Sequence, residues 1–402
     1  MVEFNTILKA YRKCARGKRQ SAECLSFELK LGEELIKLHH EIRNKTYSPK
    51  PLKCFILTEP KPREIWASHF RDRIIHHVIV EEVAKVWDRK LHPKSFACRK
   101  GMGLHAAIKD FQNQVRKLSQ GGRKTVWILQ LDVESFFYTI NRPILRKLFL
   151  RNVKDPEIRN LIEMQFDVDP RIKFRRTGDL TRFAKFPKSK SWLSKTSDQG
   201  IPIGNLTSQY GANLYLNELD HLITRKLKPQ GYLRYMDDLT LLDTDPNKLK
   251  PMEKIVNDWL IANRKQNLNA AKTSLKPLTN GIDYLGLELH QVNSPKHPVE
   301  LQIPPKKKWK FVAEAKRLSG IDWLKIKNYH PLGFPLWYEM RRELQCLNSR
   351  LGLMTKTNSK RFRTKVLRKL QLLTRQDGGW PEDKPYYGLF VRKDKLAVKL
   401  NV

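Results

Sequence analysis

The chain has 402 residues, which at roughly 100–200 residues per domain is enough for two or three lobes. Its 78 Lys and Arg residues outnumber 41 Asp and Glu residues, so the formal net charge is +37 at pH 7. Enzymes that act on small molecules rarely need such an excess of positive charge. A polyanion partner explains the excess, because each phosphate that the protein neutralises releases counterions. Composition leaves two alternatives open, a ribosome-type structural protein and a generally solubilising surface.

The five cysteines argue against two further classes of protein. Their number is odd and no two stand at CxxC spacing, so neither a zinc knuckle nor a disulfide framework is expected. Free thiols in a reducing cytoplasm are the simple account. The N-terminus has no long apolar run typical of a signal peptide, and no stretch reaches the roughly 18 apolar residues of a membrane span. We therefore expect a cytoplasmic protein with no membrane partner.

Apolar periodicity and turn residues predict the elements of the first part of the chain. In chain order they are two helices within residues 1–50 (the second from Glu23 to Ile42), a strand at 53–57, a turn at 59–62, a strand at 63–66, helices at 71–87 and 103–118, a buried strand at 126–131, and helices to about residue 166.

The second part begins with a basic, punctuated stretch at 167–200, which we interpret as a loop or an insertion. A solvated linker and a nucleic-acid contact are both open interpretations of it. The later elements are a helix at 206–227, two short strands flanking a turn within 232–242, a helix at 246–266, a hairpin at 281–289 and a basic, mostly helical tail from Pro304. Trp309, Trp323 and Trp337 in this tail are expected in the core rather than as base-stacking platforms.

Three aspartates stand at the ends of predicted strands. Asp132 follows the apolar run 126–131, and Asp237 and Asp238 separate two short apolar strands. Adjacent carboxylates in an apolar hairpin repel each other and lose hydration, so they need a neutraliser. Nucleotidyl transfer uses two divalent cations about 3.5–4 Å apart, and Mg²⁺ prefers carboxylate and water oxygens. The sequence predicts that these aspartates bind metal on one small sheet of an α+β fold; a turn that merely contains two aspartates is the alternative.

Two motifs carry a resemblance to a known family. Tyr235-Met-Asp-Asp238 is similar to the YxDD signature of reverse transcriptases, and Asp132-Val-Glu-Ser-Phe-Phe137 resembles the first catalytic motif of the same family. Further motifs follow in the family's order through about residues 50–290. The resemblance implies a right-hand polymerase: N-terminal helices and fingers in 1–125, a palm with a small antiparallel sheet in 126–290 and a basic insertion near 167–198, and a basic helical thumb with a C-terminal extension in 291–402.

The resemblance also implies a role for individual residues. Asp132, Asp237 and Asp238 would be catalytic and, with the carbonyl of Val133, would coordinate two Mg²⁺ ions, with Mn²⁺ as an alternative ion. The nucleotide-binding set would be Lys61 and Arg63 at the triphosphate, Phe137 under the sugar, where its ring excludes a 2′-hydroxyl, Ile203, Gly204 and Gln209 in the pocket motif, and Lys272 at the leaving pyrophosphate. Tyr284, Leu285 and Gly286 resemble the primer grip.

One departure from the family pattern points to a subgroup. Most group II intron and retroviral enzymes carry Gln before the Gly of the pocket motif and Pro after its Ser, where this chain has Ile203 and Gln209. This variant resembles the enzymes of diversity-generating retroelements, which copy an RNA template with errors at adenines. An isoleucine cannot make the amide's polar contact, worth about 1 kcal/mol. We therefore hypothesise that Ile203 lowers fidelity.

The function expected from the resemblance is that of an RNA-directed DNA polymerase, bacterial or phage-encoded, which copies a structured or noncoding RNA into cDNA within a mutagenic retroelement. An antiphage-defence reverse transcriptase with an associated noncoding RNA is one alternative, and an RNA-binding protein similar to intron maturases is another. Phe137 argues against an RNA-templated RNA polymerase. The expected partners are the RNA, the cDNA product, deoxynucleoside triphosphates, and a small basic accessory protein or a second polymerase subunit.

Overall fold

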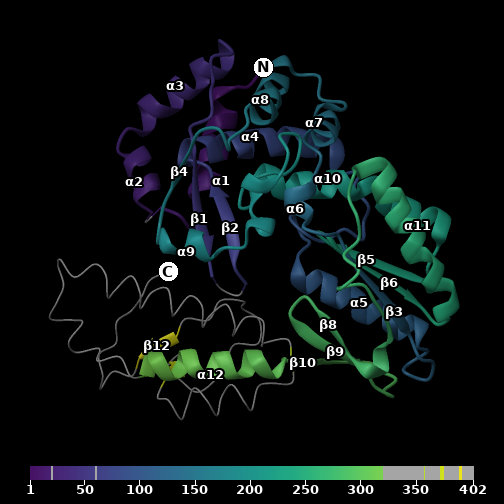
Figure 1. Cartoon of the computed structure of the whole chain (residues 1–402). Helices are drawn as coiled ribbons and strands as arrows, with labels where there is room; N and C mark the ends of the chain where they lie inside the picture. The colour runs from purple at the N-terminus through teal and green to yellow at the C-terminus, as the bar shows by residue number, and fades with distance from the viewer. Residues whose placement is uncertain (20, 59–60, 320–356, 358–371, 375–388, 392–402) are drawn as a thin grey trace. The chain divides into compact units, whose positions relative to one another are not determined.

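The computed structural model describes residues 1–319, apart from 20 and 59–60, and residues 357, 372–374 and 389–391 (Figure 1). The chain divides into two compact units. Unit 1 comprises Met1–Gln114 and Trp127–Leu275, and unit 2 comprises Val115–Val126 and Lys276–Val402. These two units do not correspond to separate fingers, palm and thumb, so the domain boundaries predicted at residues 125 and 290 stay predictions.

Unit 1 begins with three helices, α1 (Phe4–Ala15), α2 (Ala22–Glu28) and α3 (Leu31–Arg43). The single helix predicted from Glu23 to Ile42 is therefore wrong. The backbone of Lys30 leaves the helical region, with φ −124° and ψ 34°, and separates α2 from α3. Leu29 is 86% exposed at this break, so part of the apolar periodicity in the sequence does not mark a buried face.

A small sheet joins segments that are far apart in the sequence. Its order is β2-β1-β4. Its strands are β1 (Leu52–Leu57), β2 (Arg63–Ala67) and β4 (Phe174–Arg176). The β1–β2 hairpin was predicted, whereas β4 comes from the basic stretch and pairs in parallel with β1. Trp192 of the same stretch is fully buried, with its ring 5.2 Å from that of Trp66. The interpretation of this stretch as a solvated linker is therefore wrong.

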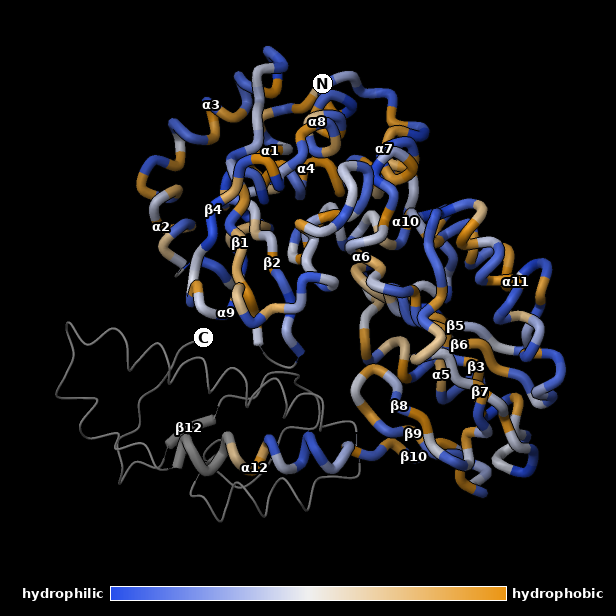
Figure 2. Tube along the Cα trace, viewed as in Figure 1, coloured by the Kyte–Doolittle hydropathy of each residue, from blue (hydrophilic) through white to orange (hydrophobic). Residues whose placement is uncertain are grey.

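A second sheet, of order β5-β6-β3-β7, carries the three predicted aspartates. Its strands are β3 (Trp127–Asp132), β5 (Gly231–Tyr235), β6 (Asp238–Asp243) and β7 (Ser274–Pro277), which begins in unit 1. β5, β6 and β3 pair antiparallel, and their hydrophobic residues appear in orange in Figure 2. Because each of these strands is covered on both faces, it reads as an apolar run, which is why the sequence indicated it. The predicted α+β class is confirmed.

Helices supply most of the hydrophobic core of unit 1. Further helical elements follow α3 along the chain. They are α4 (Phe70–Trp87), α5 (Leu104–Leu118), α6 (Phe136–Thr139), α7 (Arg142–Leu150), α8 (Pro156–Asp167), α9 (Thr181–Lys185), the 3₁₀ turns η1 (Lys188–Lys190) and η2 (Trp192–Ser194), α10 (Leu206–Leu222) with the π-helical turn η3 (Ile223–Leu227), and α11 (Pro246–Arg264). Asp155 caps α8 and Asp245 caps α11, each directly before a proline, which is a favoured way to begin a helix.

Unit 2 contains the predicted hairpin, extended by a third strand. Its described elements are β8 (Ile282–Tyr284), β9 (Leu287–Gln291), β10 (Val299–Gln302), the 3₁₀ turn η4 (Leu278–Asn280), α12 (Pro305–Ser319), β11 (Leu372–Thr374) and β12 (Leu389–Val391). Trp309 on α12 is 75% exposed, so its predicted place in the core is wrong. Trp323 and Trp337 lie outside the described residues, as does most of the predicted thumb. No described helix is both long and apolar enough to span a membrane.

Candidate active site

Two neighbouring strands bring the three aspartates to one edge of the second sheet. Asp132 is the last residue of β3, and its partner in the ladder is Asp238, the first residue of β6. The Cα atoms of directly opposed residues in antiparallel strands lie about 4.5–5.5 Å apart. Asp237 lies in the turn between β5 and β6, which Met236 makes possible by adopting a left-handed backbone with φ +57°. The fold therefore gathers the three carboxylates that the sequence singled out.

Burial and mutual repulsion disfavour the ionised form of the carboxyl groups at this edge. Burial and the Asp132 carboxylate raise the pKa of Asp237 to about 6, while Lys272 and Arg63 oppose the shift. Burial, Asp237 and Asp132 together raise the pKa of Asp238 to about 7. Carboxyl groups whose pKa values rise in this way favour any nearby cation that offsets their repulsion.

One cation already lies at the edge. Lys272 Nζ donates to both carboxylate oxygens of Asp132, at 2.7 and 2.8 Å. Asn269 places this lysine, because its backbone N–H donates to the Asp132 carbonyl at 2.8 Å and its own carbonyl accepts from the Lys272 N–H at 3.0 Å. The resemblance assigns Lys272 to the leaving pyrophosphate, whereas in this structure it pairs with the carboxylate of Asp132, which is a predicted catalytic residue.

The donor atoms at the edge fit a hard divalent cation. Three carboxylates on adjacent strands, two of them with raised pKa values, are the oxygen ligands that Mg²⁺ prefers. Among the residues that the structure describes, however, no group of three or more His, Cys, Asp or Glu side chains is arranged as a metal site. Val133 is buried and forms an isolated bridge with Leu268. Metal binding by Asp132, Val133, Asp237 and Asp238 therefore stays a proposal, and it requires Lys272 to release Asp132.

The predicted nucleotide pocket is held together by its backbone. The Ile203 carbonyl accepts from the Trp66 N–H at 3.2 Å, and the Ile201 N–H donates to the Phe137 carbonyl at 2.9 Å. Gly204 has φ +110°, a conformation that favours glycine. These contacts join the pocket motif to β2 on one side and to α6, which bears Phe137, on the other.

The remaining predicted nucleotide contacts lie around this motif. Lys61 and Arg63 are both exposed, at the β1–β2 turn and at the start of β2. The charge of Arg63 acts on Asp237, so this predicted triphosphate-binding residue lies near the aspartate edge. Gln209, one turn into α10, lies with its side-chain carbonyl oxygen 3.5 Å from the Cys98 thiol.

A buried brace beneath the Asp237 turn escaped the sequence analysis. Arg234 on β5 is fully buried and pairs with Asp220 on α10 through Nε and Nη2, both at 2.7 Å. Its Nη1 donates to the Met236 carbonyl at 2.8 Å, and its Nη2 also donates to the Ser95 hydroxyl at 2.9 Å. Because Met236 makes the turn, Arg234 fixes the backbone that presents Asp237. An arginine within an apolar strand was the available signal, since buried charges are normally paired.

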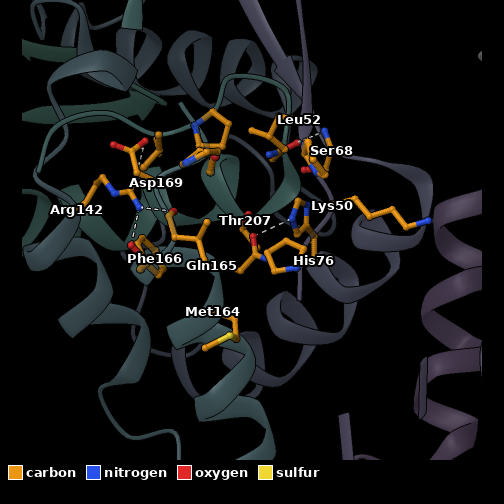
Figure 3. A pocket seen from close by; sticks show the side chains of 18 of the residues that line it. Lys50, Leu52, Ser68, His76, Arg142, Met164, Gln165, Phe166, Asp169 and Thr207 are labelled. Carbon is orange, nitrogen blue, oxygen red and sulfur yellow. Dashed lines mark hydrogen bonds and ion pairs between the residues drawn. The ribbon is translucent and has the colours of Figure 1, made fainter. Parts of the chain in front are cut away.

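A cavity of about 350 Å³ lies behind the pocket motif (Figure 3). Its walls include Ile201, Pro202 and Thr207 of the motif region and His76 of α4, but none of the predicted catalytic or nucleotide-binding residues. His76 is fully buried, which lowers its pKa to about 4, and its Nε2 lies 3.1 Å from the Gln165 side-chain oxygen. The cavity is therefore distinct from the aspartate edge.

The predicted primer grip belongs to unit 2. Leu285 and Gly286 form the turn between β8 and β9, both with positive φ (+48° and +85°), and Tyr284 is buried. Lys307 of α12 donates from Nζ to the Gly286 carbonyl at 2.5 Å. The contact of this hairpin with a primer stays a prediction.

Comparison with known proteins finds related chains. The chain is similar to the protein YkfC of Escherichia coli, with 21% identity over 332 residues that cover 74% of this chain and 81% of YkfC. It is also similar to the group II intron-encoded protein LtrA of Lactococcus lactis, with 23% identity over 48% of this chain, but it spans only 28% of LtrA. A structure of telomerase from Candida albicans with a fragment of telomeric RNA aligns to 81% of this chain and 56% of that chain at 12% identity, with a TM-score of 0.44 that is too low to support an argument.

A family model decides the assignment. The model described as reverse transcriptase (RNA-dependent DNA polymerase) matches residues 49–289, which is more than half of the chain. The matched range contains both strands of the aspartate edge, the pocket motif and the buried brace. The chain belongs to the reverse transcriptase family.

Proposed function

We propose that this protein copies a structured or noncoding RNA into cDNA by two-metal nucleotidyl transfer. The observation that carries the proposal is the meeting of Asp132, Asp237 and Asp238 at one sheet edge, with raised pKa values for the last two. Bound divalent ions, Mg²⁺ or Mn²⁺, would stabilise charge on the attacking and leaving oxygens. Their ligands would be the three carboxylates and the Val133 carbonyl.

The chain's other residues bind and orient the substrate in this proposal. Lys61 and Arg63 hold the triphosphate, and the guanidinium of Arg63 suits paired contacts to phosphate oxygens. Phe137 lies under the sugar and excludes a 2′-hydroxyl, so the substrates are deoxynucleotides. Lys272 leaves Asp132 when metal binds and stabilises the departing pyrophosphate. Gly204 and Gln209 line the base side of the pocket.

A direct test purifies the protein with its co-purifying RNA, adds magnesium and labelled deoxynucleotides, and sequences the product. Wild type is expected to make cDNA, and Asp237→Ala is expected to lose at least about a thousandfold in rate, because several kcal/mol of charge stabilisation are removed. Asp258→Ala on the exposed face of α11 is the matched control. No product from wild type, or equal product from Asp237→Ala, contradicts the proposal.

We propose that the protein is the reverse transcriptase of a mutagenic diversity-generating retroelement. The presence of Ile203 and Gln209 in the pocket motif supports this role. The Ile203 carbonyl, not its side chain, anchors the loop to Trp66, so Ile203→Gln can restore an amide without removing the anchor. We expect this variant to make several-fold fewer errors at template adenines, since one polar contact is worth about 1 kcal/mol. Sequencing the cDNA from both proteins measures this, and identical error spectra argue against the role. Gln209→Ala, which leaves Ile203 in place, is the companion control.

Two other roles remain candidates. An antiphage-defence reverse transcriptase would be encoded with a noncoding RNA, whereas a retroelement would carry a near-repeat template region and a small basic accessory protein. The similarity to LtrA, an intron-encoded protein, favours an RNA-binding role in splicing as a third candidate. That role would survive Asp237→Ala, because it needs binding without synthesis.

The family's regional organisation completes the proposal. Fingers would lie within 1–125, the palm within 126–290 and the thumb within 291–402, with Tyr284, Leu285 and Gly286 as the primer grip. The protein would act in a bacterial cytoplasm, with a small basic accessory protein or a second polymerase subunit as a further partner.

A further inference from the structure

The segment 167–198, called the basic segment below, combines strong positive charge with a fixed structure. It holds nine Lys and Arg residues against four aspartates. The aspartates are already engaged: Asp167 with Arg146 at 3.2 Å, Asp169 with Arg171 at 2.7 Å, Asp179 with Arg182 at 3.1 Å, and Asp198 with Thr196 at 2.5 Å and Asn141 at 3.2 Å. The remaining cations therefore find no carboxylate within the segment.

Most of these remaining cations are exposed. They are Lys173, Arg175, Arg176, Lys185, Lys188 and Lys190, with Lys195 half-buried. Figure 2 shows β4, which carries Arg175 and Arg176, in the blue of hydrophilic residues. Ile172 is 86% exposed and Leu180 60% exposed in the same segment. Scattered apolar side chains of this kind are ordinary on a protein surface. Exposed cations that have no carboxylate partner in the segment are the feature that suits contacts to phosphates.

The segment is held rigidly against the first sheet. β4 pairs with β1, and Trp192 packs between Trp66 and the basic segment's own Arg171, whose guanidinium lies 5.3 Å from the indole ring. Arg171 also donates from Nη1 to the Lys195 carbonyl at 2.8 Å. The exposed cations are thus displayed on a fixed frame, which reduces the entropy lost when they bind a partner.

This frame is joined to the strand that carries Arg63. The buried carboxylate of Glu64, the next residue on β2, accepts from the Ser191 hydroxyl and from the Trp192 N–H, both at 2.8 Å. In the sheet register, Arg175 lies opposite Lys53 and Arg63 opposite Leu57. With strands about 4.8 Å apart and about 3.3 Å per residue, the backbones of Arg175 and Arg63 are roughly 16 Å apart. At about 3.4 Å per nucleotide of a duplex strand, this is a span of about five nucleotides.

We propose that the basic segment is a second RNA-binding surface, which grips the phosphate backbone of the RNA about five nucleotides from the nucleotide pocket. The inference rests on the proposed function, because it takes the bound polyanion to be the RNA being copied. RNA is favoured over other polyanions because the family copies RNA, and the contact is to phosphates, which position a strand without specifying its sequence.

The test compares two triple variants of the full-length protein. Lys185→Gln/Lys188→Gln/Lys190→Gln removes three exposed charges of the basic segment, and Lys248→Gln/Lys250→Gln/Lys254→Gln removes three exposed charges of α11. Affinity for a fluorescent RNA hairpin with a long single-stranded extension is measured from 50 to 300 mM salt. Loss of three phosphate contacts is expected to lower the slope of log K against log salt by about 2 to 3, while the α11 variant keeps the wild-type slope. Equal slopes for all three proteins, or an equal fall in both variants, overturn the proposal.

Two further measurements keep the outcomes distinct. If the triple variant unfolds in a thermal scan, Lys173→Gln/Arg175→Gln replaces it, with Lys173 directly before β4 and Arg175 on it, and the same slope criterion applies with about 2 as the expected change. Tight binding of acidic vesicles or of a polyglutamate peptide in preference to RNA also overturns the proposal. The proposed function is tested separately, since a wild-type protein that makes no cDNA can still show or lack the salt-dependent RNA contact.

Discussion

Two ion pairs support the aspartate sheet, and they differ in how freely each can change. Arg234 and Asp220 are both fully buried, with two hydrogen bonds of 2.7 Å between them. Lys272 pairs with Asp132 at a similar distance, but the Lys272 side chain is 55% exposed and that of Asp132 is 11% exposed. The similar lengths conceal different costs of separation, because a buried charge left alone loses hydration that an exposed charge regains.

The difference indicates a division of labour. Arg234 is held on several sides, by Asp220, Ser95, Asn213 and the Met236 carbonyl, so it sets the shape of the turn and does not exchange partners. Lys272 can return to water at small cost, so it can leave Asp132 when a divalent ion arrives. The sheet thus combines a permanent brace with a replaceable counterion.

Breaking the buried pair is expected to have the largest effect on stability. Asp220→Ala leaves the guanidinium of Arg234 buried without its carboxylate, which should lower the free energy of unfolding by about 3–5 kcal/mol. Urea denaturation measures the change, with Asp258→Ala as the exposed control. Asp220→Ala combined with Arg234→Met should recover part of the loss. A loss below about 1 kcal/mol would show that the brace is not what holds the turn.

Breaking the exposed pair should separate stability from activity. Lys272→Ala is expected to change the free energy of unfolding by less than about 1 kcal/mol, yet to slow cDNA synthesis by about a hundredfold if the amine assists the leaving group. Lys272→Arg keeps the charge and should retain more activity. The contrast between the two pairs fails if Lys272→Ala destabilises the protein as much as Asp220→Ala does.

The smallest expected effect is a pH dependence of stability. The folded-state pKa values of about 6 for Asp237 and about 7 for Asp238 lie above the ordinary aspartate value, so the folded protein holds protons that the unfolded chain releases. Rising pH between about 4 and 7 therefore removes stability and lowers Tm. Asp237→Asn/Asp238→Asn should flatten this part of the profile in a thermal scan. Magnesium should raise Tm more at pH 8 than at pH 5, and equal shifts at both would argue against carboxylate ligands.

Local patterns predicted that the three aspartates lie at the ends of strands of one sheet, and the structure confirms that placement. Asp132 ends a contiguous apolar run, and Asp237 separates two short apolar runs, so the sequence alone indicates the strands. These strands pair antiparallel in the structure. The sequence could not show that Lys272 pairs with Asp132, because this contact crosses 140 residues. The family resemblance singled out Lys272, but it assigned this lysine to the leaving pyrophosphate and not to the Asp132 carboxylate.

The sequence did not predict the Arg234 brace, strand β4 or the break between α2 and α3, because local patterns do not encode them. The brace joins Arg234 to Ser95 across 139 residues, and no local periodicity encodes such a contact. β4 has three residues, two of them arginines, so it lacks the apolar alternation typical of a strand. Trp192 alone hinted that the basic segment packs against something. The α2–α3 break was missed because exposed leucines such as Leu29 completed a helical pattern.

The pairing of Asp132 with Lys272 has a consequence for synthesis on the ribosome. A nascent chain that has emerged from the ribosome only as far as Asp243 has all three strands β3, β5 and β6 outside, yet Lys272, which neutralises Asp132, has still to emerge. Unit 1 ends at Leu275, three residues after that lysine. The aspartate edge is therefore completed only when nearly the whole unit has been made, so chains that end before Lys272 would carry all three aspartates without the lysine that pairs with Asp132.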